Sequence, residues 1–217
     1  LEEAMCFEWL QLSAEDINRS ESYVLDRKRN EMETRYVDYA SYLQSLEMKA
    51  QVGQVSPLEA PRFAQLINKS NQFNLRTQRY NEAYIDQLMV KRSEWALLYV
   101  SLEDKFGNYG IISCLVVEKK LDKAFIDTWV MSCRVLNRGV EDIAFNLICE
   151  TAQKWNCSWI VGEFLPTKKN KLVLGLYEKL GFENCPRNFF KNTTPEGTLY
   201  RVKPAEISKK IHFIEIL

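Results

Sequence analysis

The stretch AFIDTWVMSCRVLNRGVEDIAFNLICETAQKW, residues 124–155, decides the predicted fold of this 217-residue chain. Its first part, AFIDTWVMSCR, is rich in aromatic and β-branched residues and predicts a buried strand. Its last part repeats apolar or small residues three and four positions apart, at 140, 143, 144, 147, 148, 151, 152 and 155. That spacing is typical of an amphipathic helix packed on a sheet, so the stretch predicts a strand, a sharp turn and a helix.

The turn between this strand and this helix is a candidate anion-binding site. The first amide groups of a helix have no partner within it, and the helix dipole favours negative charge there. Arg134 and Arg138 flank the turn, and its remaining candidate contacts are Asn137, Gly139 and Val140. An ordinary strand–helix turn with two solvated arginines is the alternative interpretation of the same residues.

The composition indicates a folded protein without a strong charge preference. The chain is 46% hydrophobic and has 29 basic and 29 acidic residues. This balance argues against nucleic-acid or membrane-surface binding, and no apolar run approaches the roughly 20 residues of a membrane span. The six cysteines form no C-x-x-C pair, so we expect free thiols, Cys133 packed among them, in a reducing, cytoplasmic compartment. With His212 as the only histidine, no metal site is expected.

The rest of the chain predicts a helical connector followed by one α/β domain. Residues 13–49 are rich in charge and contain no Gly and no Pro, and we assign residues 1–47 to the connector and 48–217 to the domain. Three strands in series, then helix, strand and helix, predict a mixed sheet with helices on both faces. The expected strands lie at 48–55, 94–104, 110–120, 124–134, 157–166, 182–190 and 197–204, and the expected helices include 81–90 and 167–182.

The segment NKSNQFNLRTQRY, residues 68–80, is unusually dense in amide and hydroxyl side chains. A surface loop favours such residues in any case. The functional interpretation is a loop that contacts a substrate through hydrogen bonds and an aromatic anchor, with the candidate residues Asn71, Gln72, Phe73, Asn74 and Thr77.

These patterns together resemble a known family. The element order over residues 48–204 resembles the GNAT acyltransferase fold, whose strand-to-helix turn binds the pyrophosphate of coenzyme A. Residues 170–182 resemble the GNAT closing helix, an Asn followed by Tyr-x-x-x-Gly-Phe. The segments NKSNQFNLRTQRY, WVMSCRVLNRGVE and LPTKKNKLVLGLYEKLGF, with the connector, resemble the C-terminal half of FkbH-like proteins, which carry an N-terminal HAD-type (class IIIC) domain.

The resemblance implies an acyltransferase. Its donor would be coenzyme A, acyl-CoA or the phosphopantetheine of an acyl carrier protein, its acceptor a small molecule, and an N-terminal HAD-like domain would precede residue 1. Tyr177 stands where GNAT enzymes place the acid that protonates the leaving thiolate, and Asn170 stands on the cofactor side. A core position on the helix stripe is the alternative for Tyr177.

The sequence departs from the GNAT pattern at two positions that matter for coenzyme A binding. The GNAT pyrophosphate motif, Gln/Arg-x-x-Gly-x-Gly/Ala, has Leu136 at its first position and Glu141 at its last. A carboxylate there would repel a phosphate, although Arg134 and Arg138 would compensate.

Glu163 and Asp127 are candidate bases, because a charged side chain in an apolar strand can have a perturbed pKa. The alternative for each of them is a strand position that faces solvent. Two functions therefore remain open: an acyltransferase, and a non-catalytic module that holds a carrier protein or pantetheine arm for the HAD domain.

Overall fold

The computed structural model describes residues 14–191 and 193–217, with side chains from residue 24 onward. In this part of the chain nine strands form one sheet, of order β7-β8-β6-β5-β4-β3-β1-β9, and β2 pairs with β5 off this path. The strands are β1 Lys49–Gln54, β2 Phe73–Asn74, β3 Trp95–Asp104, β4 Gly107–Lys120, β5 Lys123–Met131, β6 Trp159–Phe164, β7 Glu183–Asn184, β8 Thr198–Val202 and β9 Glu215–Ile216.

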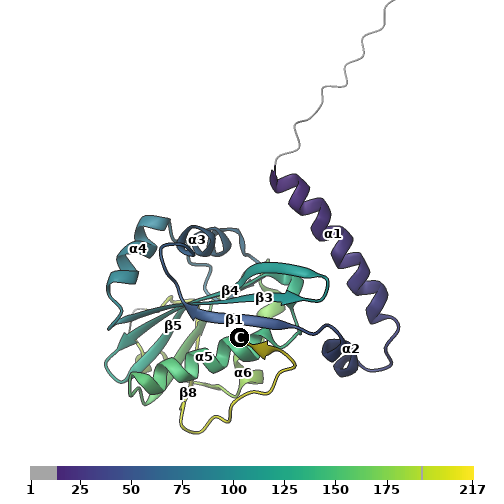
Figure 1. Ribbon diagram of the computed structural model, residues 1–217. Helices are drawn as coiled ribbons and strands as arrows, with labels where there is room; N and C mark the ends of the chain where they lie inside the picture. Colours follow the sequence, from purple (N-terminus) through teal and green to yellow (C-terminus); the bar gives the residue numbers. More distant parts are fainter. Residues whose placement is uncertain (1–13, 192) are drawn as a thin grey trace, which may run out of the picture.

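Helices cover both faces of this sheet (Figure 1). The α-helices are α1 Ala14–Glu33, α2 Tyr39–Ser45, α3 Ala60–Lys69, α4 Glu82–Val90, α5 Val140–Lys154 and α6 Leu176–Leu180, and the 3₁₀ turns are η1 Cys133–Val135, η2 Lys171–Val173 and η3 Arg187–Phe189. The α3 and α4 helices lie on one face, and α5 and α6 lie on the other. Since β5 and β6 are parallel while β3, β4 and β5 are antiparallel, the predicted mixed sheet with helices on both faces is confirmed.

The core has one layer on each face of the sheet. The apolar stripe of α5 is buried as its spacing predicts, and Phe145 packs there with Trp129 of β5, both fully buried. On the opposite face, Phe63 and Ile67 of α3 pack with Val116 and Val130 of β4 and β5. Because β4 and β5 are covered on both faces, all their central residues are buried.

The connector packs more closely on the domain than its polar sequence predicts. Arg29 of α1 is buried, and it donates two hydrogen bonds, of 2.7 and 2.9 Å, to the carboxylate of Asp104 at the end of β3. Tyr42 and Leu46, in and just after α2, belong to the main core. The boundary at residue 47 therefore stays a prediction, and the helix cap expected at Ser13 lies outside the described residues.

One predicted helix is interrupted. The apolar stripe over residues 167–182 predicts a continuous helix, but the structure has only η2 and α6 there, separated at Leu174 and Gly175. Gly175 has φ +78°, the left-handed conformation that ends a helix and that glycine adopts without steric cost. Glycine at position 181, directly after the last residue of the apolar stripe, predicts the end of a helix there, and the structure confirms it: Gly181 follows α6 with φ +99°. Short pieces replace the long helix because the glycine lies in its middle.

Candidate functional site

The site is built where β5 and β6 separate. The two parallel strands pair from Lys123 with Trp159 to Ile126 with Gly162, and no further. Beyond this point β5 pairs with β2, and the main-chain oxygen of Leu75 accepts a 2.9 Å hydrogen bond from the amide of Leu165. The segment 73–75 therefore lies between the separated strands and satisfies main-chain groups that would otherwise be unpaired.

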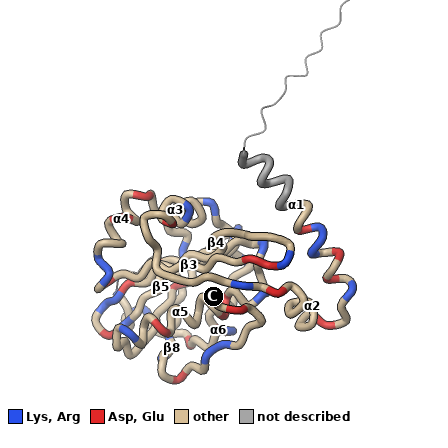
Figure 2. Tube along the Cα trace, in the orientation of Figure 1, with Lys and Arg blue, Asp and Glu red and all other residues tan. Residues whose placement is uncertain are grey.

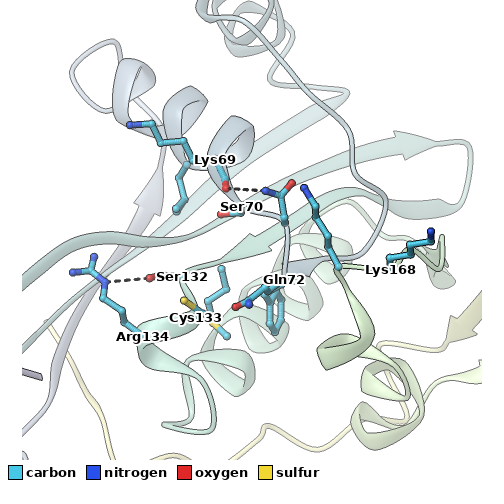
Figure 3. A pocket seen from close by; sticks show the side chains of 12 residues that line it. Lys69, Ser70, Gln72, Ser132, Cys133, Arg134 and Lys168 are labelled. Carbon is cyan, nitrogen blue, oxygen red and sulfur yellow. Dashed lines mark hydrogen bonds between the residues drawn. The ribbon is translucent and has the colours of Figure 1, made fainter. Parts of the chain in front are cut away.

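Two cavities flank this segment. The first, which we call the basic pocket, has a volume of about 780 Å³ and includes four cationic side chains, Lys69, Arg134, Lys168 and Lys169. Figure 3 shows that Lys69, Arg134 and Lys168 come from three separate segments, the end of α3, η1 and the loop after β6. Asn71, Gln72 and Cys133 also line it.

The second cavity, which we call the leucine groove, has a volume of about 370 Å³. Its apolar wall comes from the loop after η1 and from the η2–α6 region, through Leu136, Leu172, Val173, Leu174, Leu176 and Leu180. Its polar wall includes Asn137, Gly139, Glu141 and Asp142 of the candidate anion turn. Phe73 lines both cavities, so it forms part of the wall between them.

The candidate anion turn is engaged by the protein itself. The main-chain amide of Asn137 donates a 2.9 Å hydrogen bond to the carboxylate of Glu141. Arg138 donates a 2.6 Å hydrogen bond to the hydroxyl of Tyr109 and lies 3.8 Å from a carboxylate oxygen of Asp104. The roles expected for Asn137, Arg138, Gly139 and Val140 stay predictions, and this geometry favours the ordinary turn.

Gly139 of this turn has φ +91°, and the C-terminal segment passes close to it: a Cβ at this position would lie 3.1 Å from the Cβ of His212.

Burial raises the pKa of Glu141 above its usual range, and the hydrogen bond from Asn137 offsets only part of this shift. The turn thus carries a carboxylate that titrates at higher pH than an exposed Glu.

A buried arginine, which the sequence did not single out, joins the two candidate bases. Arg76 donates hydrogen bonds of 2.7 Å to Glu163 and of 2.7 Å to Asp127. Glu163 is fully buried, and its other oxygen accepts a 2.6 Å bond from the amide of Thr194. Asp127 also accepts from the hydroxyl of Tyr80. The base role stays a prediction for both carboxylates, and in this arrangement each is already ion-paired with Arg76.

Tyr177 is a buried residue with an unpaired hydroxyl. Its ring packs between Phe182 and Tyr200, at centroid distances of 4.9 and 5.1 Å. Its hydroxyl lies against Gly162, beside the separation of β5 and β6, and has no hydrogen-bond partner among the described residues. Burial raises the pKa of Tyr177, which keeps the phenol protonated as an acid must be. Its catalytic role stays a prediction.

The remaining candidate residues divide into two groups. Asn170 is fully buried: its amide nitrogen donates to the main-chain oxygens of Asn74 and Leu165, at 2.9 and 2.8 Å, and its oxygen accepts from the amide of Thr167 at 2.7 Å. Asn74 is also buried, and its side-chain oxygen accepts from the amide of Thr77. Asn170, Asn74 and Thr77 thus take part in hydrogen bonds that hold the main chain in place. Asn71, Gln72 and Phe73 instead line the basic pocket.

Cys133 corrects an expectation. A packed thiol was expected, but Cys133 is exposed and lines the basic pocket, while the other described cysteines are buried. The reason is local: β5 ends at Met131, and η1 follows directly after it.

In the part of the chain that the structure describes, no group of three His, Cys, Asp or Glu side chains is placed to hold a metal, and no helix is long and apolar enough to cross a membrane.

Replacing Gly162 with Ala is expected to destabilise the protein by about 1–3 kcal/mol. A Cβ at this position would lie 2.3 Å from the ring of Tyr177, which is held between two other aromatic rings. Urea unfolding measures the change. Gly53→Ala is the matched control, because a Cβ there meets Tyr99 at 3.5 Å, an ordinary contact. Equal stability of the two variants would show that the Tyr177 ring moves freely.

Comparisons with known proteins give the fold. No protein-family model matches the sequence, and no curated protein sequence matches it. Among solved structures, the ribosomal-protein-S18-alanine N-acetyltransferase from Escherichia coli aligns with a TM-score of 0.51 and 13% identity, over 75% of this chain and 99% of that chain. A GNAT-family acetyltransferase from Staphylococcus aureus aligns with a TM-score of 0.55 and 9% identity, over 71% and 99%.

An acetyltransferase from Streptococcus agalactiae aligns with a TM-score of 0.52 and 14% identity, over 72% of this chain and 98% of that chain. At identities this low the likeness concerns the fold alone. The chain has the GNAT fold, as the order of its elements predicts.

Proposed function

We propose that this GNAT-fold chain is an acyltransferase that moves an acyl group from a pantetheine thioester to a small-molecule acceptor. The observation that carries the proposal is that the leucine groove and the basic pocket share Phe73 where β5 and β6 separate. A transferase needs a donor site and an acceptor site that lie next to each other, because positioning supplies much of its rate enhancement. The leucine groove supplies the donor side, and the basic pocket supplies the acceptor side.

The residues of the leucine groove fit one part of coenzyme A better than the other. A pantetheine arm is a narrow chain of methylene groups and two amides, which suits a wall of leucines and exposed main chain. The diphosphate suits the groove's polar lining poorly, because the two carboxylates of Glu141 and Asp142 outnumber its one cation among the described residues, Lys179. We therefore favour the phosphopantetheine arm of an acyl carrier protein over free coenzyme A. The HAD-like neighbour domain belongs to the same proposal, through the sequence resemblance.

The side chains around this point would divide the work as follows. A bound pantetheine thioester would supply the activated acyl group. Tyr177 would hold a proton at its hydroxyl beside Gly162 and give it to the departing sulfur. Of the two carboxylates, Asp127 would take a proton from the acceptor, because it is slightly exposed whereas Glu163 is fully buried, although neither lines the basic pocket or the leucine groove. Arg76 holds both carboxylates in position.

The second candidate, a non-catalytic module that holds a carrier protein or pantetheine arm, is favoured by two other observations. Both candidate bases are ion-paired with Arg76. In addition, Phe73 separates the two cavities, so the segment 73–75 must shift before donor and acceptor can meet. Both functions require that the chain binds the pantetheine arm, but only the acyltransferase transfers the acyl group from it.

The experiment that tests the proposal compares four donors at equal concentration: acetyl-CoA, acetyl-pantetheine, and a carrier protein with and without its acetyl-phosphopantetheine arm. Binding is measured by calorimetry, and turnover by the appearance of free thiol in the presence of a mixture of small-molecule acceptors. The acyltransferase proposal expects binding of the arm-bearing carrier and release of its thiol. Binding without thiol release supports the module, and no preference for the arm-bearing carrier over the bare carrier contradicts both.

Replacing Glu141 with Gln is expected to tighten coenzyme A binding roughly fivefold, about 1 kcal/mol, because it removes a negative charge beside the diphosphate. Glu150→Gln is the matched control, since Glu150 lies near the other end of α5 and its loss changes the net charge equally. Calorimetry with coenzyme A measures both. If the two variants bind coenzyme A alike, the diphosphate does not lie at this turn.

The raised pKa of Glu141 predicts that the affinity for coenzyme A depends on pH. Burial raises the pKa of Glu141, and its charge is present above that pKa. As the pH falls through this raised pKa, Glu141 loses its charge, so the affinity of wild-type protein for coenzyme A should rise. The rise should vanish in Glu141→Gln, which separates it from protonation of the ligand's own phosphates. A wild-type profile identical to that of the variant would contradict it.

A further inference from the structure

We propose that the basic pocket binds a phosphate-bearing small molecule. Among the described residues, its lining includes the cations Lys69, Arg134, Lys168 and Lys169 and no carboxylate. The chain as a whole has equal numbers of acidic and basic residues, and Figure 2 shows the two kinds interspersed over the body of the protein. A cavity with walls of one sign focuses the field on its interior and attracts ions of the opposite sign.

The cations of this pocket are held by defined structure. Lys168 and Lys169 lie in a loop closed by Thr167, whose hydroxyl accepts 3.2 Å hydrogen bonds from the amides of Lys169 and Asn170. Asn170 in turn anchors the loop to the main chain of Asn74. The wall that carries the two lysines is therefore fixed before a ligand arrives, which lowers the entropy cost of binding.

The opposite wall is also ordered and polar. Arg134 lies in η1 and donates a 3.4 Å hydrogen bond to the hydroxyl of Ser132, with its guanidinium 5.8 Å from the ring centroid of Tyr109. Gln72 adds an amide beside it (Figure 3). Arginine and lysine donors facing one cavity suit the several oxygens of a phosphate group. A volume of about 780 Å³ is in the range of small-molecule sites.

This inference does not need acyl transfer to be correct. If the chain is a transferase, the phosphate group has two sources: a phosphorylated acceptor, or the phosphate end of the donor. Glycerol 3-phosphate represents the first source and coenzyme A the second, while glycerol and pantetheine are their counterparts without phosphate. Binding of these four compounds is measured on the full chain by calorimetry, without any turnover.

Cys133 reports where the ligand binds. Its thiol is exposed in the same pocket, so a phosphate compound bound there should slow its alkylation by iodoacetamide. Coenzyme A and pantetheine are supplied for this experiment as their S-acetyl thioesters, so that their own thiols do not consume the reagent. Mass spectrometry of peptides follows Cys133 separately from every other cysteine. The expected result is that glycerol 3-phosphate binds more tightly than glycerol, more weakly at high salt, and protects Cys133. Coenzyme A protecting Cys133 while glycerol 3-phosphate does not assigns the pocket to the donor's phosphates.

Paired variants decide whether the pocket or the overall charge is responsible. Lys168→Ala with Lys169→Ala should weaken phosphate binding about tenfold, the loss expected for charge-assisted hydrogen bonds. Lys28→Ala with Lys91→Ala changes the net charge equally at exposed positions on α1 and after α4, and should leave binding unchanged. Equal loss in both pairs, no advantage of either phosphate compound over its neutral counterpart, or binding without protection of Cys133 would overturn the proposal.

Discussion

Replacing Arg76 with Met is expected to lower the free energy of unfolding by about 3–5 kcal/mol. Arg76 is buried and ion-paired with both Asp127 and Glu163, which come from neighbouring strands. Removing the guanidinium leaves two buried carboxylates without a counter-charge, and the cost of an uncompensated buried charge exceeds that of an exposed ion pair. Urea unfolding at neutral pH measures this change in the free energy of unfolding.

Two further variants make this prediction specific. Arg27→Ala removes an exposed ion pair with Glu31 and should change stability by less than about 1 kcal/mol. Adding Asp127→Asn and Glu163→Gln to Arg76→Met removes the unpaired charges and should recover much of the lost stability. If Arg76→Met were as mild as Arg27→Ala, the three charged groups would not form one buried network.

Replacing Tyr177 with Phe is expected to reduce acyl transfer by about 10²–10⁴-fold without destabilising the protein. The variant keeps the ring and its packing, and it removes a hydroxyl that has no hydrogen-bond partner among the described residues. Loss of such a group costs no hydrogen bond, so the fold should be at least as stable. Thiol release from an acyl-phosphopantetheine carrier gives the rate, and thermal unfolding gives the stability.

Tyr200→Phe is the control for this experiment. It also removes one hydroxyl from the same aromatic stack, but that hydroxyl donates a 2.8 Å hydrogen bond to Glu178 and does not touch Gly162. The control should transfer acyl groups at close to the wild-type rate. A Tyr177→Phe variant with unchanged turnover would make Tyr177 a packing residue.

Local patterns predict the parts of the fold that depend on local physics. The stretch 124–155 gives β5 and α5 because both burial patterns are strong and lie within one segment. The break at Gly175 shows the limit of this approach. The apolar stripe of residues 167–182 continues across the glycine, and the stripe alone does not reveal that Gly175 adopts the left-handed conformation.

The site was harder to predict because its contacts are distant in sequence. Arg76 lies 51 residues from Asp127 and 87 residues from Glu163, so no local pattern connects them. Two acids within apolar strands are a signal of a buried counter-charge, but nothing in the sequence marks Arg76 as its source. Asn170 shows the opposite case: the sequence motif was visible, but only the structure shows its amide bound to three main-chain groups.

The most direct test of the account follows a labelled acyl group. An acyl-phosphopantetheine carrier with a labelled acyl group is incubated with wild-type chain and a mixture of small cellular metabolites, and free thiol and labelled products are measured together. The account predicts that label leaves the thioester and is recovered on an acceptor in an amount equal to the thiol released. If the carrier binds but all label remains as thioester in every acceptor mixture, the chain is not an acyltransferase.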